Sequence, residues 1–196
     1  MSDASSELQH ANLPAEPERP RLPDDLIPLL TASGRTTTLA VYSGRTLVVQ
    51  LVRYFGCLPC QEYLRELDRR KAELEAMGAV AVAVGSSADY QARQLRESGI
   101  AMPLLLDPDG GLRNWLGFTD LTMRQMAAPS GIRSYLAAMR SGLRPRVPTR
   151  DVVKSPGIAI FDADLRLLWM HEGRRLGDYP PIHALLATVA SLRRPG

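Results

Sequence analysis

Cys57 and Cys60 are the only cysteines in this chain of 196 residues, and two residues separate them. The pair follows a nearly continuous apolar run, Leu47 to Val52, which is typical of a strand buried on both faces. Pro59 fits the first turn of a helix, because no amide donor is needed there. The sequence therefore predicts that the pair lies where a central strand ends and a helix begins.

This position favours redox chemistry. At a helix N-terminus the free N–H groups and the helix dipole stabilise a thiolate, so we expect a lowered pKa for Cys57. Cys60 lies one turn further on the same face, so a disulfide can close with little movement. A thiolate that attacks an oxidised sulfur or oxygen would then be resolved by the second thiol. Arg53, at the strand end, either favours the Cys57 thiolate or is solvated.

Two alternatives to redox chemistry are a metal site and a pair of inert buried thiols. A zinc site needs two further ligands; no other cysteine exists, His10 lies in a polar tail, and His171 and His183 lack zinc-finger spacing. We therefore expect neither a metal nor a cofactor. Inert thiols are less typical of a C-x-x-C at a strand-to-helix junction.

Strands and helices alternate along the rest of the chain. The segment "GRTTTLAVYSGRTLVVQLVRYF" predicts two β-runs joined by a Ser-Gly turn, and "AVAVAVG" and "MPLLLD" predict further strands. Helices are expected after the cysteines, from about Asp89 to Ser98 with Ser86 or Ser87 as cap, and around Leu112 to Leu116. "GIAIFD" and "LLWMHE" predict a closing hairpin, and "PPIHALLATVASL" a final helix. This order predicts an α/β fold, a central mixed sheet flanked by helices.

The chain divides into a tail, a domain and an insert. Residues 1–25 hold four prolines and no hydrophobic periodicity, which predicts a flexible N-terminal tail before one domain over 26–196. The insert at about 119–150, before the hairpin, is too long for a bare loop. Within it Ile132, Tyr135, Leu136 and Met139 recur at helical spacing. We expect one amphipathic helix there, packed through this face on the domain or on a second subunit.

Charge and composition bound the partners. The formal net charge is +3, and residues 121–150 contain six arginines and no acid. These arginines either form a solvated surface or bind an anionic substrate or partner. Nucleic acid is not expected, because aromatic side chains do not alternate with them. The acidic, polar start is unlike a secretory signal, and the apolar runs are too short to span a membrane. We therefore expect a cytoplasmic protein with no membrane partner.

Four segments carry a family resemblance: "VVQLVRYFGCLPCQEYLREL", "AVAVAVGSS", "PLLLDPDGGLRNWLGF" and "GIAIFDADLRLLWMHEGRRLGDYPP". In order and spacing they resemble the peroxiredoxin-like (AhpC/TSA-like) branch of the thioredoxin superfamily, over about residues 26 to 192. The resemblance implies a thioredoxin-like fold in which Cys57 attacks and Cys60 resolves. It also implies a cis-proline loop at Ser155 and Pro156, which would bind substrate together with Tyr54 and Arg53.

The peroxiredoxin motif P-x-x-x-T-x-x-C is incomplete, since Gln50 and Tyr54 occupy its proline and threonine positions before Cys57. The sequence thus predicts a thiol-dependent oxidoreductase of antioxidant, peroxiredoxin-like character, with slow peroxide turnover. It would reduce small-molecule peroxides or protein disulfides and be recycled by a thioredoxin- or glutathione-type reductant; a homodimer is left open. Alternatives are a disulfide reductase without peroxidase activity and a non-catalytic thioredoxin-fold module that binds a partner.

Overall fold

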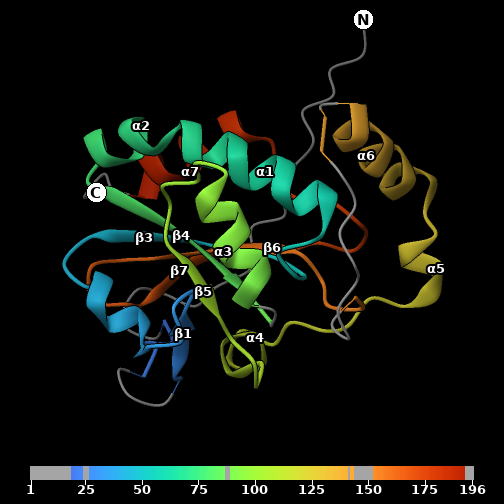
Figure 1. Ribbon diagram of the computed structural model, residues 1–196. Helices are drawn as coiled ribbons and strands as arrows, with labels where there is room; N and C mark the ends of the chain where they lie inside the picture. The colour runs from blue at the N-terminus through green and yellow to red at the C-terminus, as the bar shows by residue number, and fades with distance from the viewer. Residues whose placement is uncertain (1–18, 24–26, 87–88, 141, 144–151, 193–196) are drawn as a thin grey trace, which may run out of the picture.

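One mixed sheet organises the chain (Figure 1). The computed structural model describes residues 19–23, 27–86, 89–140, 142–143 and 152–192. In this part of the chain seven strands lie in the order β2-β1-β5-β4-β3-β6-β7. The central β5, β4 and β3 run parallel, and the other neighbours pair antiparallel. The strands are β1 (Leu29–Thr31), β2 (Thr36–Thr37), β3 (Thr46–Leu51), β4 (Ala79–Gly85), β5 (Leu104–Leu106), β6 (Gly157–Phe161) and β7 (Leu167–Glu172).

Helices cover both faces of the sheet, as the alternating pattern predicts. The larger apolar cluster joins one sheet face to α1, α2, α3 and α7, and the smaller cluster joins the other face to α4 and the 3-10 helix η2. The helices are η2 (Leu39–Tyr42), α1 (Leu58–Arg69), α2 (Lys71–Ala76), α3 (Asp89–Glu97), α4 (Gly111–Trp115), α5 (Met123–Met126), α6 (Pro129–Arg140) and α7 (Ile182–Leu192).

Strand β3 is central because its side chains are apolar on both faces. Val48 belongs to the larger cluster, whereas Leu47 and Val49 belong to the smaller one, in keeping with the two-residue period of a strand. Both neighbours of β3 hold it in register along its length, β4 in parallel and β6 antiparallel. The strand therefore delivers the chain to a fixed point at the carboxyl edge of the parallel strands, just before the two cysteines.

The N-terminal part differs from the sequence prediction. The first expected β-run is only the two-residue β2, followed by η2, whose first turn is capped by the Thr38 hydroxyl through the Ala40 N–H. The unpredicted β1 pairs with β5. Leu22 is buried, its N–H donates to the Leu165 carbonyl, and Pro20 accepts from Leu167. Residues 19–23, which the sequence assigned to the tail, thus pack on the domain; residues 1–18 and 24–26 lie outside the described residues.

The insert contains the expected helix, but the helix presents a different face to the domain. In α6 the buried residues are Gly131 and Ala138, whereas Ile132, Leu136 and Met139 are 49%, 46% and 45% exposed. A helix turns by about 100° per residue, so the packing face is displaced by roughly one residue from the predicted one. The small face fits because α6 approaches closely: a Cβ on Gly131 would lie 3.0 Å from the Leu176 Cβ.

Candidate dithiol site

The two cysteines lie at the predicted junction. Cys57 is the N-cap residue of α1, and Pro59 stands in its first turn. The Cys57 N–H donates to the Tyr54 carbonyl at 3.1 Å, and the Gln61 N–H donates to the Cys57 carbonyl at 2.9 Å. These bonds form the turn that leads from strand to helix. Both cysteines are free thiols, and their sulfur atoms are 2.6 Å apart.

The two thiols titrate as an interacting pair, because their sulfurs lie only 2.6 Å apart. Burial raises the pKa of Cys57, and its hydrogen bond to Cys60 raises it further. Burial acts on Cys60 too, but the Cys57 thiol, Arg53 and Tyr179 outweigh it and lower the pKa of Cys60 to about 7. The direction for Cys57 is thus opposite to the one expected from its place at the helix N-terminus, because burial raises its pKa.

Arg53 is the cation beside the sulfurs, and it is not solvated. It is 4% exposed, and its Nη1 lies 3.9 Å from the Cys57 Sγ. Its Nε donates to the Lys154 carbonyl at 3.1 Å, and its Nη2 contacts the Met126 Sδ at 3.8 Å. The guanidinium also lies 5.9 Å from the centre of the Tyr54 ring. Arg53 thus stabilises negative charge on the pair, one of the two roles left open by the sequence.

Tyrosine hydroxyls surround the pair, and the sequence pointed to only one of them, Tyr54. The Tyr179 hydroxyl lies at the Cys60 sulfur and donates to the Leu51 carbonyl at 3.1 Å. Tyr54 and Tyr135 lie close to each other and to Cys57. The pKa of each of the three is raised, first by burial, so each stays a neutral hydrogen-bond donor. No sequence motif marks Tyr135 or Tyr179, which reach the site from the insert and from the loop before α7.

Gln50 occupies the motif's proline position and supports the site from the sheet. It is fully buried on β3, and its Nε2 donates to the Cys60 carbonyl at 3.1 Å. A proline could not make this bond, since it lacks a side-chain donor. At this departure from the peroxiredoxin motif, the Gln50 side chain therefore holds the backbone of Cys60 through a hydrogen bond that a proline could not make.

Ser155 and Pro156 lie beside the site, but the peptide bond of Pro156 is trans, so the predicted cis-proline is wrong. Pro156 immediately precedes Gly157, which pairs with Leu51 at the end of β3. Two hydrogen bonds hold the segment: Arg113 Nη1 donates to the Ser155 carbonyl at 2.6 Å, and the Gly173 N–H donates to the Pro156 carbonyl at 2.7 Å. Trans is the intrinsically favoured isomer of an X-Pro bond, and both carbonyls are satisfied in it.

Arg113 is a second buried cation that the sequence did not single out. It is 4% exposed, and its Nη2 donates to the Val52 carbonyl at 2.5 Å. It therefore ties the end of β3 to the start of β6. Burial lowers the pKa of Arg113, while Tyr179, Cys60 and Asp107 act in the opposite direction. A lone arginine in a short helix carries no sequence signal for this role.

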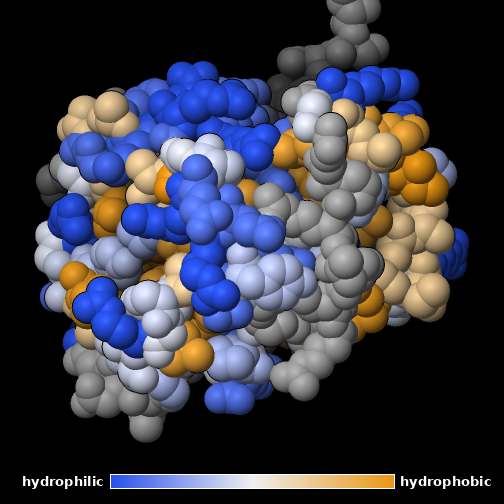
Figure 2. Space-filling model, viewed as in Figure 1, coloured by the Kyte–Doolittle hydropathy of each residue, from blue (hydrophilic) through white to orange (hydrophobic). Residues whose placement is uncertain are grey.

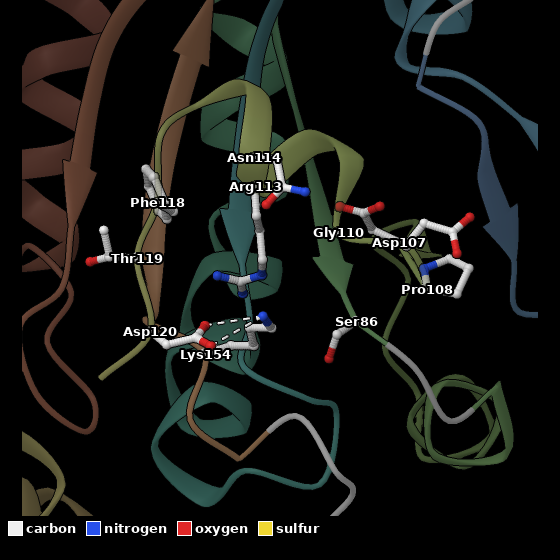
Figure 3. Close-up of a pocket in the computed structure, with 11 residues that line it drawn as sticks. Ser86, Asp107, Pro108, Gly110, Arg113, Asn114, Phe118, Thr119, Asp120 and Lys154 are labelled. Atoms are coloured by element: carbon white, nitrogen blue, oxygen red, sulfur yellow. Dashed lines mark hydrogen bonds and ion pairs between the residues drawn. The ribbon is translucent and has the colours of Figure 1, made fainter. Parts of the chain in front are cut away.

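A polar cavity of about 280 Å³ opens beside Arg113 (Figure 3). Neither cysteine lines it. It meets the site through the backbone around Arg53, whose carbonyl accepts from the Ser86 hydroxyl at 2.8 Å. Ser86 is therefore not a free helix cap; Ser87 lies outside the described residues. The cavity is lined by Ser86, Asp107, Pro108, Asp109, Gly110, Arg113, Asn114, Phe118, Thr119, Asp120 and Lys154, the last two forming an ion pair of 3.0 Å.

The sulfurs are buried within the main apolar cluster, and α6 covers the start of α1 beside them. Cys57 and Cys60 are 0% and 1% exposed. Leu58, between them, packs with Ala138, Leu143 and Tyr135 in a small apolar cluster of its own. Even a small peroxide can therefore reach the sulfurs only if this cover or the neighbouring side chains shift. Within the described residues no group of three or more His, Cys, Asp or Glu side chains is placed to hold a metal.

The sheet order, the helices on both faces and the C-x-x-C at the start of α1 define a thioredoxin-like α/β protein of the peroxiredoxin type. The model of the AhpC/TSA family matches residues 21–132, more than half of the chain, and the chain belongs to this family. Among curated proteins, peroxiredoxin-like 2C of Mus musculus is 25% identical over 177 residues, covering 83% of this chain and 77% of the mouse protein.

Solved structures support the same fold. The bacterioferritin comigratory protein of Xanthomonas campestris, studied for its alkyl peroxide reduction, superposes with a TM-score of 0.60 at 15% identity, covering 88% of this chain and 94% of that one. Peroxidoxin BcpB of Mycobacterium tuberculosis gives a TM-score of 0.63 at 17% identity, covering 90% and 97%. At these identities the likeness concerns the fold alone. In the described part of the chain no helix is long and apolar enough to cross a membrane.

Proposed function

We propose that this protein is a thiol oxidoreductase that reduces hydroperoxides or disulfides through a dithiol/disulfide cycle of Cys57 and Cys60. The observation that carries the proposal is the 2.6 Å separation of the two sulfurs at the N-terminus of α1. A disulfide bond is about 2.05 Å long, so the pair can close with very small movements. Arg53 and the Tyr179 hydroxyl add the stabilisation that a thiolate needs.

The proposed cycle consists of oxidation of the pair by the substrate and its reduction by external thiols. A thiolate attacks the terminal oxygen of a hydroperoxide, the O–O bond breaks, and the alcohol leaves with a proton, so that the attacking cysteine becomes a sulfenic acid. The second thiol attacks that sulfur, water leaves, and the disulfide forms. An external dithiol or two thiols then return two electrons and two protons. The resemblance assigns attack to Cys57, whereas the pKa directions favour the thiolate on Cys60.

Alkyl hydroperoxides are the substrate class we propose first, since the Xanthomonas campestris relative reduces alkyl peroxides. Peroxide reduction needs a donor to the leaving oxygen, and the motif threonine that supplies it elsewhere is replaced by Tyr54. The neutral hydroxyls of Tyr54 and Tyr135 near Cys57 are the substitutes that we propose. A missing donor commonly costs about 10²- to 10³-fold in rate. Turnover should therefore be slower than that of a peroxiredoxin with the complete motif.

Exchange with a protein disulfide is the second candidate, because it needs only a reachable thiolate and a resolving thiol. We propose a thioredoxin- or glutathione-type reductant and a cytosolic location, where such reductants keep a close cysteine pair reduced. A non-catalytic module that only binds a partner stays the competing hypothesis.

Stopped-flow oxidation of the reduced full chain tests the proposal. Hydrogen peroxide, an organic hydroperoxide and a model disulfide are compared, with thiol titration and intact mass as readouts. We expect one disulfide per hydroperoxide consumed, and faster oxidation by the organic hydroperoxide than by the model disulfide. Oxidation by the disulfide alone would reassign the protein as a disulfide reductase. If neither class oxidised the reduced chain above the rate of free cysteine, the binding-module hypothesis would replace the enzyme.

A further inference from the structure

Large apolar side chains gather on the outer surface of α5 and α6. Met123 is 76% exposed, and Ile132, Leu136 and Met139 are each nearly half exposed. These four residues, called the insert face below, stand out over α5 and α6 in Figure 2. In the described part of the chain only Val41 and Tyr90 are comparably exposed large hydrophobics, and neither lies on these helices. A contiguous apolar patch of this kind indicates an interaction surface.

On α5 and α6 themselves the charged side chains beside the insert face are all positive, whereas Glu62 and Glu66 of α1 line a groove along another side of α6. Arg124, Arg133 and Arg140 are exposed on the same two helices, and none of the three forms an ion pair within the described residues. Residues 121–150 contain no aspartate or glutamate at all. A second copy of this chain would bring arginines against arginines across a two-fold interface, which disfavours self-association. The positive charge of these arginines therefore favours an anionic partner.

The shape and side-chain types favour a lipid surface among anionic partners. Ile132, Leu136 and Met139 recur at i, i+4 and i+7, so they form a stripe along the outside of one helix. All are aliphatic, and arginines flank them. This combination is that of helices which lie in the plane of an anionic membrane surface. Protein-binding surfaces, by contrast, rely on buried aromatic anchors and pockets.

We propose that the insert face docks on an anionic lipid surface, with Ile132, Leu136 and Met139 among the acyl chains and Arg124, Arg133 and Arg140 at the head groups. That no helix among the described residues is long enough to span a membrane does not bear on this, because a helix lying on a surface needs no spanning length. The sequence-based expectation of no membrane partner rested on the start of the chain and on spanning length, and neither bears on a helix that lies on a surface.

Docking would place the dithiol next to the lipid. The inner face of α6 packs on the C-x-x-C through Ala138 and Leu58, so a single helix separates the sulfurs from the insert face. A helix with its side chains is about 10 Å across. If the proposed peroxide reduction is correct, hydroperoxides of membrane lipids come within reach when the cover shifts. The docking itself does not depend on the redox activity.

Vesicle co-sedimentation of the reduced full chain tests the docking. Vesicles of phosphatidylcholine alone are compared with vesicles of phosphatidylcholine mixed with phosphatidylglycerol. We expect binding to the mixed vesicles only, weakened about fivefold by each of Arg124→Gln, Arg133→Gln and Arg140→Gln. Leu136→Gln should weaken it by about tenfold. Val41→Gln and Arg96→Gln change exposed residues of the same types elsewhere and should leave binding unchanged.

Separate readouts distinguish this proposal from the proposed enzyme. A Cys57→Ser, Cys60→Ser double variant should bind the mixed vesicles as the wild type does, and Leu136→Gln should oxidise with a small soluble hydroperoxide at the wild-type rate. Three results would overturn the docking. One is no binding to either vesicle, or equal binding to both. Another is a dimer, seen in sedimentation, that Leu136→Gln converts to a monomer. A second copy of the chain would then be the partner that covers the insert face. The last is retention on polyglutamate but not on the mixed vesicles, which would indicate an acidic protein surface.

Discussion

Two twelve-residue helices, α1 and α6, use their side chains in opposite ways. Helix α1 turns its large residues, Leu64 and Leu67, into the main core, and its first turn holds the cysteines. Helix α6 turns Gly131 and Ala138 inward and leaves Leu136 and Met139 outside. The difference lies in what each helix packs against. Beneath α1 lies the sheet, with room for leucines. Beneath α6 lie α1 and the loop at Leu176 and Gly177, so closely at Gly131 that no side chain fits there, although Tyr135 packs against the Leu58 cluster further along the helix.

We expect the redox chemistry to depend on α1 and the proposed docking to depend on α6. Variants in α1 should therefore change oxidation, and variants on the outside of α6 should change vesicle binding. Cys57→Ser and Cys60→Ser should each abolish multiple turnover with any hydroperoxide, because neither can close the disulfide. The cysteine that attacks should still support one round of oxidation in the other's absence, leaving a sulfenic acid that dimedone traps. Turnover that survived in both variants would show that the pair is not the redox centre and would remove the chemical role of α1.

The pH dependence of alkylation tests which sulfur carries the charge. A thiol of lowered pKa reacts as thiolate above that pKa, and its rate falls roughly tenfold per pH unit below it. With the pKa of Cys60 at about 7, labelling of the reduced folded chain by iodoacetamide should be half-maximal near neutrality and appear first on the Cys60 peptide. In denaturant the midpoint should move up to the ordinary value for cysteine.

Faster labelling of Cys57 would support the assignment of attack to that residue by family resemblance. It would mean that Cys57 is the thiolate and that Cys60 keeps its proton. Equal, slow labelling of both at every pH would mean that the cover over α1 stays closed on the time scale of the reaction. Either outcome concerns the thiols at the start of α1 and leaves the docking proposed for α6 unchanged.

The small inner face of α6 predicts an asymmetric response to substitution. Ala138→Leu inserts bulk where Ala138 packs on Leu58, and overpacking of this kind costs about 1–3 kcal/mol. Leu136→Ala, two residues away but outward, should change the free energy of unfolding by no more than about 0.5 kcal/mol. Urea unfolding of both variants measures the difference. A larger loss for Leu136→Ala would mean that the outward face is buried in solution, and the contrast between the helices would disappear.

The sequence predicts the parts of this structure that depend on strong local patterns. The apolar run of β3, Pro59 in the first turn and the C-x-x-C spacing together place the cysteines correctly. Periodicity also finds α6, since exposed and buried apolar residues have the same spacing. It cannot choose the packing face, because that choice depends on how closely Leu176 approaches Gly131, two residues far apart in the sequence.

The rest of the site comes from distant segments that carry no motif. Arg113 reaches the strand ends from α4, and Tyr179 reaches Cys60 from the loop before α7. Each makes an ordinary contact that becomes significant only when the sheet brings the segments together. The raised pKa of Cys57 has a related cause: the helix N-terminus is visible in the sequence, whereas the burial that outweighs it comes from side chains of the main core.

The smallest effect we expect concerns Tyr179, whose hydroxyl lies between the Cys60 sulfur and the Leu51 carbonyl. Its single proton can serve either acceptor, so it should favour the sulfur when Cys60 is a thiolate. Tyr179→Phe removes that donor. The pKa of Cys60 should rise by up to about one unit, with a loss of stability of about 1 kcal/mol from the bond to Leu51.

Tyr63 offers a matched control, because its ring stacks on that of Tyr179 at 4.4 Å while its buried hydroxyl makes no hydrogen bond to the described residues. Tyr63→Phe keeps the stacking, removes an unsatisfied hydroxyl, and should be neutral or slightly stabilising. The alkylation midpoint of each variant separates the two roles. An equal shift in both would show that packing of the ring pair, and not the Tyr179 hydroxyl, holds the pKa of Cys60 down. An unchanged midpoint in both would leave the Cys57 thiol and Arg53 as the groups that stabilise the thiolate at the start of α1.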